Sequence, residues 1–161
     1  MAFAPTAELE QELERIVSRY PSAAAACLPV LKECQQANQG WVSPEVVAFV
    51  ADRLGLSTAQ VEGVVTFYSL LNQQRPGEHE VWVCRTLSCA LRGSEELLGR
   101  CQKKLGIVPG QTTPDGRVTL RTAECLASCG TAPVVRVDRD YHENVTPQEL
   151  DRILERLLYE G

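Results

Sequence analysis

The segment Glu-Val-Trp-Val-Cys-Arg-Thr-Leu-Ser-Cys occupies residues 80–89 and joins a short apolar run to two cysteines. Its first half is rich in β-branched and aromatic side chains, which predicts a strand over residues 80–84. Cys84 ends this strand, and four residues separate it from Cys89. The segment therefore predicts a sheet whose first strand leads directly into a loop with two thiols.

A second pair of cysteines, Cys125 and Cys129, encloses three residues and follows the first pair after thirty-five residues. Strand-like runs at residues 117–121 and 133–137 flank it, so this pair also lies in a loop beside a strand. In a small sheet the two loops can leave from the same end, which would bring the four thiols together. That arrangement is typical of a metal centre.

Spacing alone leaves the nature of this centre open. A 2Fe–2S cluster binds two cysteines per iron and suits loops of this length, whereas a zinc site with four thiolates is the alternative. A dithiol oxidoreductase needs Cys-x-x-Cys, which the sequence lacks. A Rieske centre needs two histidine ligands, and the two histidines of the chain, His79 and His142, lie outside both cysteine pairs.

The other three cysteines have a simpler explanation. Cys27 and Cys34 fall on one apolar stripe of a predicted helix, and Cys101 falls on the apolar side of another. A free cysteine is commonly buried as a small apolar side chain. We therefore expect these three thiols in the core.

The composition limits the classes of function. The chain has 44% hydrophobic and 23% charged residues, as a globular protein does, and its net charge of −5 argues against nucleic-acid binding. No apolar run approaches the roughly 20 residues that span a bilayer. Residues 1–13 lack the features of a signal or transit peptide. We expect a cytoplasmic protein that meets membranes only indirectly.

The first part of the chain has a helical pattern, with apolar residues at three- and four-residue spacing. Ser43-Pro44 is a typical helix start, and Ser57 with Gln60 matches a capping box. A linker-like segment follows at residues 72–80. We predict a small helical bundle as a domain of residues 1–76. Its expected helices cover residues 9–20, 22–38, 43–54 and 57–68.

The second predicted domain, residues 77–161, has a mixed pattern. A helix over residues 93–105 and a final helix that begins near Thr146-Pro147 accompany the three strands. The order strand, helix, strand, strand, helix favours a compact sheet with helices packed on it. We expect a thioredoxin-like α/β arrangement, so that the whole chain belongs to the α+β class.

Longer stretches resemble one known family, the thioredoxin-like 2Fe–2S subunit of respiratory complex I, the NADH:quinone oxidoreductase. The cysteine spacing is one part of the resemblance, which extends over nearly the whole chain. The helical half adds Gly40-Trp41-Val42 and Glu62-Gly63-Val64-Val65-Thr66-Phe67-Tyr68-Ser69, and the second half adds Thr113-Pro114-Asp115-Gly116, Glu124-Cys125-Leu126 and Ala132-Pro133-Val134.

The resemblance implies one 2Fe–2S cluster, with Cys84 and Cys89 on one iron and Cys125 and Cys129 on the other. It also implies a partner, the NADH-binding flavoprotein subunit, which binds FMN and NADH and exchanges electrons with this cluster. The isolated chain would then catalyse no reaction, and its sequence contains no Gly-rich dinucleotide motif. Such a complex would hold the chain at the cytoplasmic face of the inner membrane.

One position departs from the family pattern. The family commonly has Cys-Leu-Gly where this chain has Cys125-Leu126-Ala127. If the loop requires a positive φ at the third residue, alanine costs on the order of 1 kcal/mol relative to glycine. The departure bears on the geometry of the loop and leaves the expected ligands unchanged.

Two alternatives remain open from the sequence. An equivalent subunit of a soluble NAD-linked formate dehydrogenase, or of a bidirectional or bifurcating hydrogenase, would have the same cysteines, because the catalytic differences lie in other subunits. A zinc-stabilised interaction module would use the same thiols only for structure. For the leading interpretation, the helical half is a reasonable surface for binding the flavoprotein subunit.

Overall fold

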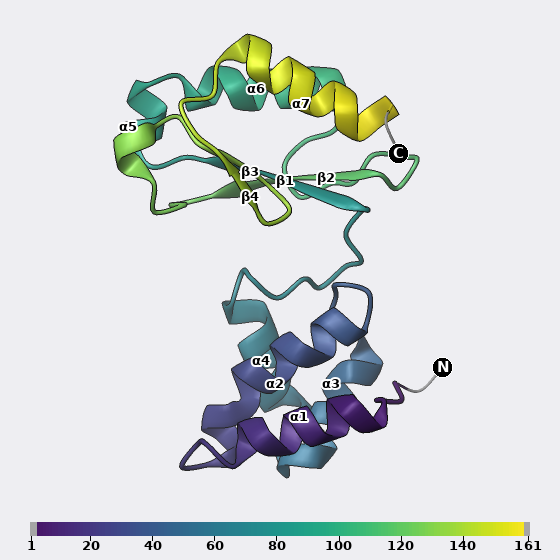
Figure 1. Cartoon of the computed structure of the whole chain (residues 1–161). Helices are drawn as coiled ribbons and strands as arrows, with labels where there is room; N and C mark the ends of the chain where they lie inside the picture. The colour runs from purple at the N-terminus through teal and green to yellow at the C-terminus, as the bar shows by residue number, and fades with distance from the viewer. Residues whose placement is uncertain (1–2, 160–161) are drawn as a thin grey trace. The chain divides into compact units, whose positions relative to one another are not determined.

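The computed structural model describes residues 3–159 of the chain. The chain forms two compact units, which divide between Arg75 and Pro76 (Figure 1). The first unit is helical and the second combines a sheet with helices, so the α+β class is confirmed. The limits 1–76 and 77–161 for two separate domains stay a prediction.

Residues 3–75 contain four helices, each begun by a hydroxyl side chain. Thr6, Ser22, Ser43 and Ser57 each accept a hydrogen bond from the backbone N–H three residues on, which pairs an N–H group that a helix start leaves unbonded. The Gln60 side chain completes the predicted capping box at Ser57. The helices are α1 (Ala7–Val17), α2 (Ala23–Ala37), α3 (Pro44–Leu54) and α4 (Thr58–Phe67).

The core of the first unit consists of the apolar stripes of these helices. Leu13, Leu31 and Val50 are fully buried there. Cys27 and Cys34 lie in the same core, as predicted, and burial raises the pKa of Cys34 to about 12. A thiol with such a pKa stays protonated at neutral pH and is unreactive.

The second unit is built on one mixed sheet. Within residues 76–159, four strands follow one another across the sheet in the order β2-β1-β3-β4. β1 and β2 are parallel, whereas β3 is antiparallel to β1 and β4 is antiparallel to β3. The strands are β1 (His79–Cys84), β2 (Val118–Ala123), β3 (Val135–Val137) and β4 (Asp140–His142).

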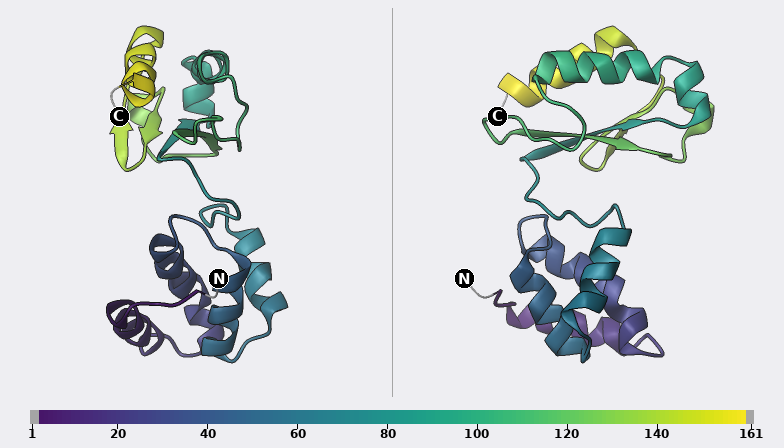
Figure 2. Two further views of the ribbon diagram at one scale, coloured as in Figure 1. Left: turned by 90° about the vertical axis from the view of Figure 1, so that its right-hand side faces the viewer. Right: turned by 180° about the vertical axis from the view of Figure 1, so that it is seen from behind.

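Helices α6 (Ser94–Leu105) and α7 (Pro147–Tyr159) lie side by side on one face of this sheet (Figures 1 and 2). The alternation of β1 points Val81 and Val83 toward the helices, where both are buried. Cys101 of α6 is buried in the same core, as predicted, and burial raises its pKa to about 12.

Two short elements go beyond the sequence prediction. α5 (Leu87–Leu91) occupies the segment that the sequence suggested to be a plain loop, and β4 adds a fourth strand. α5 has five residues and no side-chain cap, and β4 has three residues with Asp140 and Tyr141 exposed. Neither is long enough to show a periodic pattern.

Among the described residues, no helix has both the length and the apolar character that crossing a bilayer requires.

Replacing the helix cap in Ser57→Ala should lower the free energy of unfolding of the helical unit by about 1 kcal/mol, because the N–H of Gln60 loses its partner. Urea denaturation followed by circular dichroism measures the change. Ser69→Ala, at an exposed serine outside any helix, is the matched control. Equal midpoints for the two variants would contradict the importance of the cap.

Candidate metal centre

The parallel pairing of β1 and β2 determines where the two cysteine loops begin. Cys84 at the end of β1 lies opposite Ala123 at the end of β2, and Cys125 follows two residues later. The pairing continues one residue beyond the end of β1, where the backbone N–H of Arg85 donates to the carbonyl of Ala123 at 2.8 Å. The expectation that both loops leave the same end of the sheet is thus confirmed.

The four thiols differ in their burial. Cys84 and Cys89 are buried in a small apolar cluster with Leu126, Ala132 and Val134, whereas Cys125 and Cys129 are exposed. Cys89 lies in α5, and Cys129 begins the 3-10 turn η1 (Cys129–Thr131), which contacts α5. One pair of thiols is therefore enclosed by the protein and the other faces solvent.

Two of the other thiols affect the pKa of Cys89. Burial raises the pKa of the Cys89 thiol, and its hydrogen bond with Cys84 raises that pKa further, while a backbone hydrogen bond from Val134 opposes the change. Cys129 adds a smaller effect in the same direction as Cys84. The Cys125 sulfur accepts a hydrogen bond from the backbone N–H of Ala127 at 3.2 Å.

The donor set fits an iron–sulfur cluster. Its fit is one of chemistry and location, because in the described part of the chain no three Cys, His, Asp or Glu side chains lie close enough together to hold a metal ion, the four thiols included. Soft thiolates are the ligands that iron–sulfur clusters prefer, and a backbone N–H directed at a ligand sulfur, as in Ala127, is typical of such sites. His79 hydrogen-bonds Asp138 at 2.8 Å and begins β1, at the opposite end of the strand from Cys84.

Polar side chains fix the second cysteine loop to the segment after β4. Glu143 accepts hydrogen bonds from Ser128 and from Thr131, the latter at 2.7 Å, and these bonds lower the pKa of its carboxyl. The backbone N–H of Asn144 donates to the carbonyl of Thr131 at 2.7 Å. No sequence pattern connects Glu143 with the site, because the contact forms only when β3 and β4 return the chain to this end of the sheet.

The backbone at Ala127 has the conformation that the comparison with Cys-Leu-Gly suggested. Its φ is +58°, in the left-handed region that favours glycine. The cost of alanine there is on the order of 1 kcal/mol. The hydrogen bonds of Ser128 and Thr131 to Glu143 hold the loop in this strained form.

A charged pair lies beside the site at the surface. Arg85 and Glu124 approach to 3.8 Å, and both side chains are well exposed. An ion pair this open to water contributes little to stability. With 57% of its side chain exposed, Arg85 is in contact with water.

The second unit has a thioredoxin-like fold, with a mixed sheet, helices on one face and cysteine loops at one end. Its four thiols and backbone donors are typical of a ferredoxin. The comparison with protein families supports this class over almost the whole length of the chain. Residues 13–158 match the model of the thioredoxin-like [2Fe-2S] ferredoxin family. The chain belongs to this family, which confirms the prediction of a 2Fe–2S cofactor.

Named relatives are similar over most of their length. An NADH-quinone oxidoreductase subunit of Rickettsia conorii is 37% identical over 146 residues, which cover 89% of this chain and 87% of the relative. NADH-quinone oxidoreductase subunit 2 of Thermus thermophilus is 41% identical over 145 residues, or 88% of this chain and 80% of the relative. The resemblance seen in the sequence motifs is thus confirmed.

A solved structure shares the fold. An NAD+-reducing [NiFe]-hydrogenase in the air-oxidized state superposes with a TM-score of 0.70 at 16% identity over 81% of this chain. This chain spans 23% of the length of that hydrogenase chain. At such low identity the similarity concerns the fold alone.

Replacing the strained residue in Ala127→Gly should raise the free energy of unfolding by about 1 kcal/mol, because glycine adopts a positive φ without steric cost. Chemical denaturation followed by tryptophan fluorescence measures the change. Ala48→Gly, at an exposed position within α3, should have the opposite sign, since glycine weakens a helix interior. Destabilisation in both variants would contradict the strain at Ala127.

Proposed function

We propose that this chain binds one 2Fe–2S cluster through Cys84, Cys89, Cys125 and Cys129 and acts as an electron-transfer subunit of NADH:quinone oxidoreductase. The observation that carries the proposal is the position of the two cysteine pairs at one end of the sheet. The relatives named NADH-quinone oxidoreductase subunits, which match nearly the whole chain, support the assembly.

The chain supplies the ligands and their surroundings. When bound, a 2Fe–2S cluster takes up and returns one electron at a time. Cys84 and Cys89 would hold one iron within the apolar cluster, and Cys125 and Cys129 would hold the other at the surface. The backbone N–H of Ala127 stabilises negative charge on the Cys125 sulfur, which favours the ligated thiolate.

The partner in this proposal is the NADH-binding flavoprotein subunit. FMN and NADH bind to that partner, and this chain exchanges electrons with the FMN. The chain by itself then oxidises no NADH, and it meets the cytoplasmic face of the membrane only through its complex. Co-purification from the native host tests the assembly, since a formate dehydrogenase or hydrogenase would bring different catalytic subunits.

A surface for this electron exchange lies beside the exposed cysteines. Leu87 and Leu91 are spaced one helical turn apart on α5 and are 73% and 79% exposed. Cys89 lies between them in the sequence with its side chain buried on the opposite side. Two large apolar side chains in contact with water on either side of a ligand favour contact with another protein.

The zinc-stabilised module has no observation in its favour beyond the four thiols. Membership in the ferredoxin family favours the cluster over structural zinc. Anaerobic preparation with iron would distinguish them, because a cluster is coloured and gives a paramagnetic signal after one-electron reduction, whereas bound zinc gives neither.

The variant Cys125→Ser should abolish the cluster or shift its absorption spectrum strongly, because a hard oxygen replaces a soft thiolate. Iron content and optical absorption measure the result. Cys101→Ala is the matched control: it removes a buried thiol that is part of the helical packing of the second unit, so the spectrum should not change. An unchanged spectrum in Cys125→Ser would contradict the ligand assignment.

The variant Leu87→Ser should weaken binding to the flavoprotein subunit about tenfold, because it removes an exposed apolar contact beside the cluster. The rate at which NADH and the flavoprotein reduce the cluster should fall accordingly at limiting concentrations. Val108→Ser, at another exposed apolar residue of the same unit, should have no effect. If both variants reacted as the wild type does, α5 would not be the contact.

A further inference from the structure

Three neighbouring strands of the second unit bring a tryptophan and two arginines together on one face of the sheet. Val81 and Val83 point toward α6 and α7, so Trp82 between them projects from the other face of the sheet. Arg121 of β2 and Arg136 of β3 both lie opposite Trp82 in the strand register. Their guanidinium carbons lie 5.4 Å and 4.9 Å from the centroid of the Trp82 ring. We call Arg121, Trp82 and Arg136 the Trp82 row.

The two arginines of the row differ in how their charge is balanced. The Nε–H of Arg121 donates to a carboxylate oxygen of Glu80 at 2.7 Å, and both of these side chains are mostly buried. Among residues 3–159 no carboxylate pairs with Arg136, and its Nε is buried without a hydrogen-bond partner. A guanidinium group stays protonated in proteins. The row therefore has one positive charge that no described acid pairs with.

The Trp82 row lies beside the cysteine end of the sheet. Trp82 and Cys84 are two residues apart on β1, so they share a face of the sheet and lie about 7 Å apart along the strand. On the neighbouring strand, Arg136 is likewise two residues from Val134, whose carbonyl accepts a hydrogen bond from the N–H of Cys84 at 3.2 Å. These spacings place the charge of Arg136 on the order of 10 Å from the Cys84 thiol.

Arg136 differs from the arginine that is next to Cys84 in the sequence. Arg85 is well exposed, and the carboxylate of Glu124 approaches it to 3.8 Å. Water and an opposite charge both weaken the effect of such a cation on its surroundings. Arg136 is partly buried and has no such counter-charge among the described residues. Its charge therefore acts on the cysteine site with less screening.

The chemistry of the row explains why a tryptophan holds this arginine. A carboxylate would fix the guanidinium group but would also cancel its charge, as Glu80 does for Arg121. The Trp82 ring is uncharged, so its cation–π contact fixes Arg136 and leaves the positive charge in place. Reduction adds one electron, and thus one negative charge, to a 2Fe–2S cluster. A positive charge held nearby stabilises the reduced form.

We propose that Arg136, held in place by Trp82, raises the reduction potential of the 2Fe–2S cluster. The inference rests on the proposed function, which supplies the cluster and its ligands. Arg136 is not a ligand and acts through its charge, and Trp82 is the residue that positions it. With a higher potential, the chain accepts an electron from the FMN of its partner more readily and returns it less readily.

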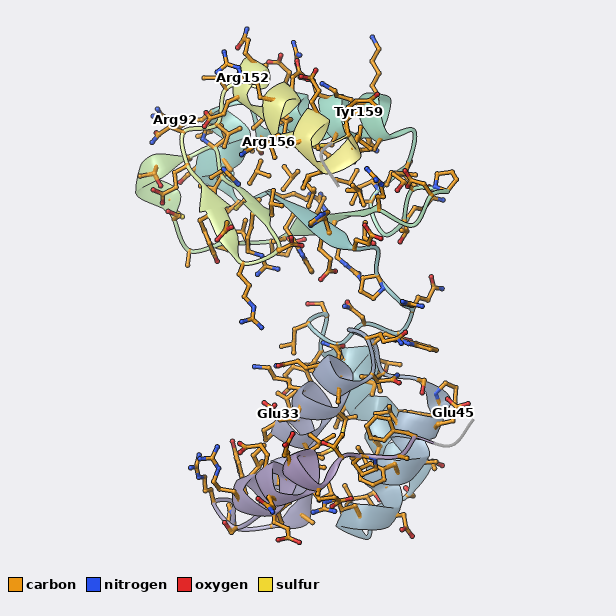
Figure 3. All side chains as sticks on the ribbon, turned by 45° about the vertical axis from the view of Figure 1, so that its right-hand side comes forward. Glu33, Glu45, Arg92, Arg152, Arg156 and Tyr159 are labelled. Atoms are coloured by element: carbon orange, nitrogen blue, oxygen red, sulfur yellow. The ribbon has the colours of Figure 1, made fainter. Side chains whose placement is uncertain are left out.

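The experiment is a redox titration of the full-length, cluster-loaded chain, followed by the paramagnetic signal of the reduced cluster. In Arg136→Gln the ratio of reduced to oxidised cluster at a fixed potential should fall about tenfold, which equals a decrease of about 59 mV in midpoint potential. Arg136→Lys retains the charge and should restore most of the wild-type potential. Arg156→Gln is the matched control and should leave the potential unchanged. It removes the same charge from an exposed position on α7 (Figure 3), near His79 at the end of β1 opposite Cys84.

The variant Glu80→Gln provides a test of opposite sign. It leaves the charge of Arg121 unpaired on the other side of Trp82, so its cluster should be easier to reduce than that of the wild type. Altered packing of the row would move the potentials of Glu80→Gln and Arg136→Gln in the same direction, and that result would overturn the inference. If Arg136→Gln bound no cluster, Glu80→Gln would decide alone, since an unchanged or lower potential in it would also overturn the inference.

The remaining outcomes separate this inference from the proposed function. A cluster whose potential Arg136→Gln leaves unchanged would overturn the inference and leave the function intact. Absence of a cluster from the wild-type chain after anaerobic preparation with iron and sulfide would contradict both. An equal decrease in Arg136→Gln and Arg156→Gln would assign the effect to the net charge of the chain and overturn the role of the Trp82 row.

Discussion

The parallel pairing of β1 with β2 is the constraint on which the second unit depends. Its register sets Cys84 opposite Ala123, so two loops that are far apart in the sequence begin at one end of one sheet. A shift of one residue would turn Val81 and Val83 away from the helices and expose the core. The same hydrophobic alternation that stabilises the sheet therefore also determines the position of the thiols.

The cysteine loops show how strain and support are combined at this end of the sheet. Ala127 holds a backbone conformation that glycine would adopt without cost, and the hydrogen bonds of Ser128 and Thr131 to Glu143 keep the loop in place. Strained residues persist where the surrounding structure determines them strongly. The strain also directs the N–H of Ala127 at the sulfur of Cys125, which links the loop conformation to the ligand.

The sequence predicts those parts of the structure that depend on nearby residues. Helix starts such as Ser43-Pro44 and Ser57 with Gln60 are local, and the structure has them as expected. α5 and β4 are too short for a periodic signal, and both depend on tertiary neighbours: β4 pairs with β3, and α5 contacts α6 and η1. Glu143 is distant in sequence from the loop that it supports, so only the folded chain reveals its role. The cysteine spacing indicated a metal centre, but it took the similarity along the whole chain to favour iron and sulfide over zinc.

The pairing of β1 also sets an order of events during synthesis on the ribosome. Each helix of the first unit packs on a neighbour in the sequence, and such local contacts form quickly. β1 emerges next, but its parallel partner β2 ends only at Ala123, and the support from Glu143 comes later still. We therefore expect a folded helical unit followed by an unpaired β1 strand with accessible thiols until β2 has emerged. Iron and sulfide would bind only late in synthesis, after the chain beyond β4 has left the ribosome.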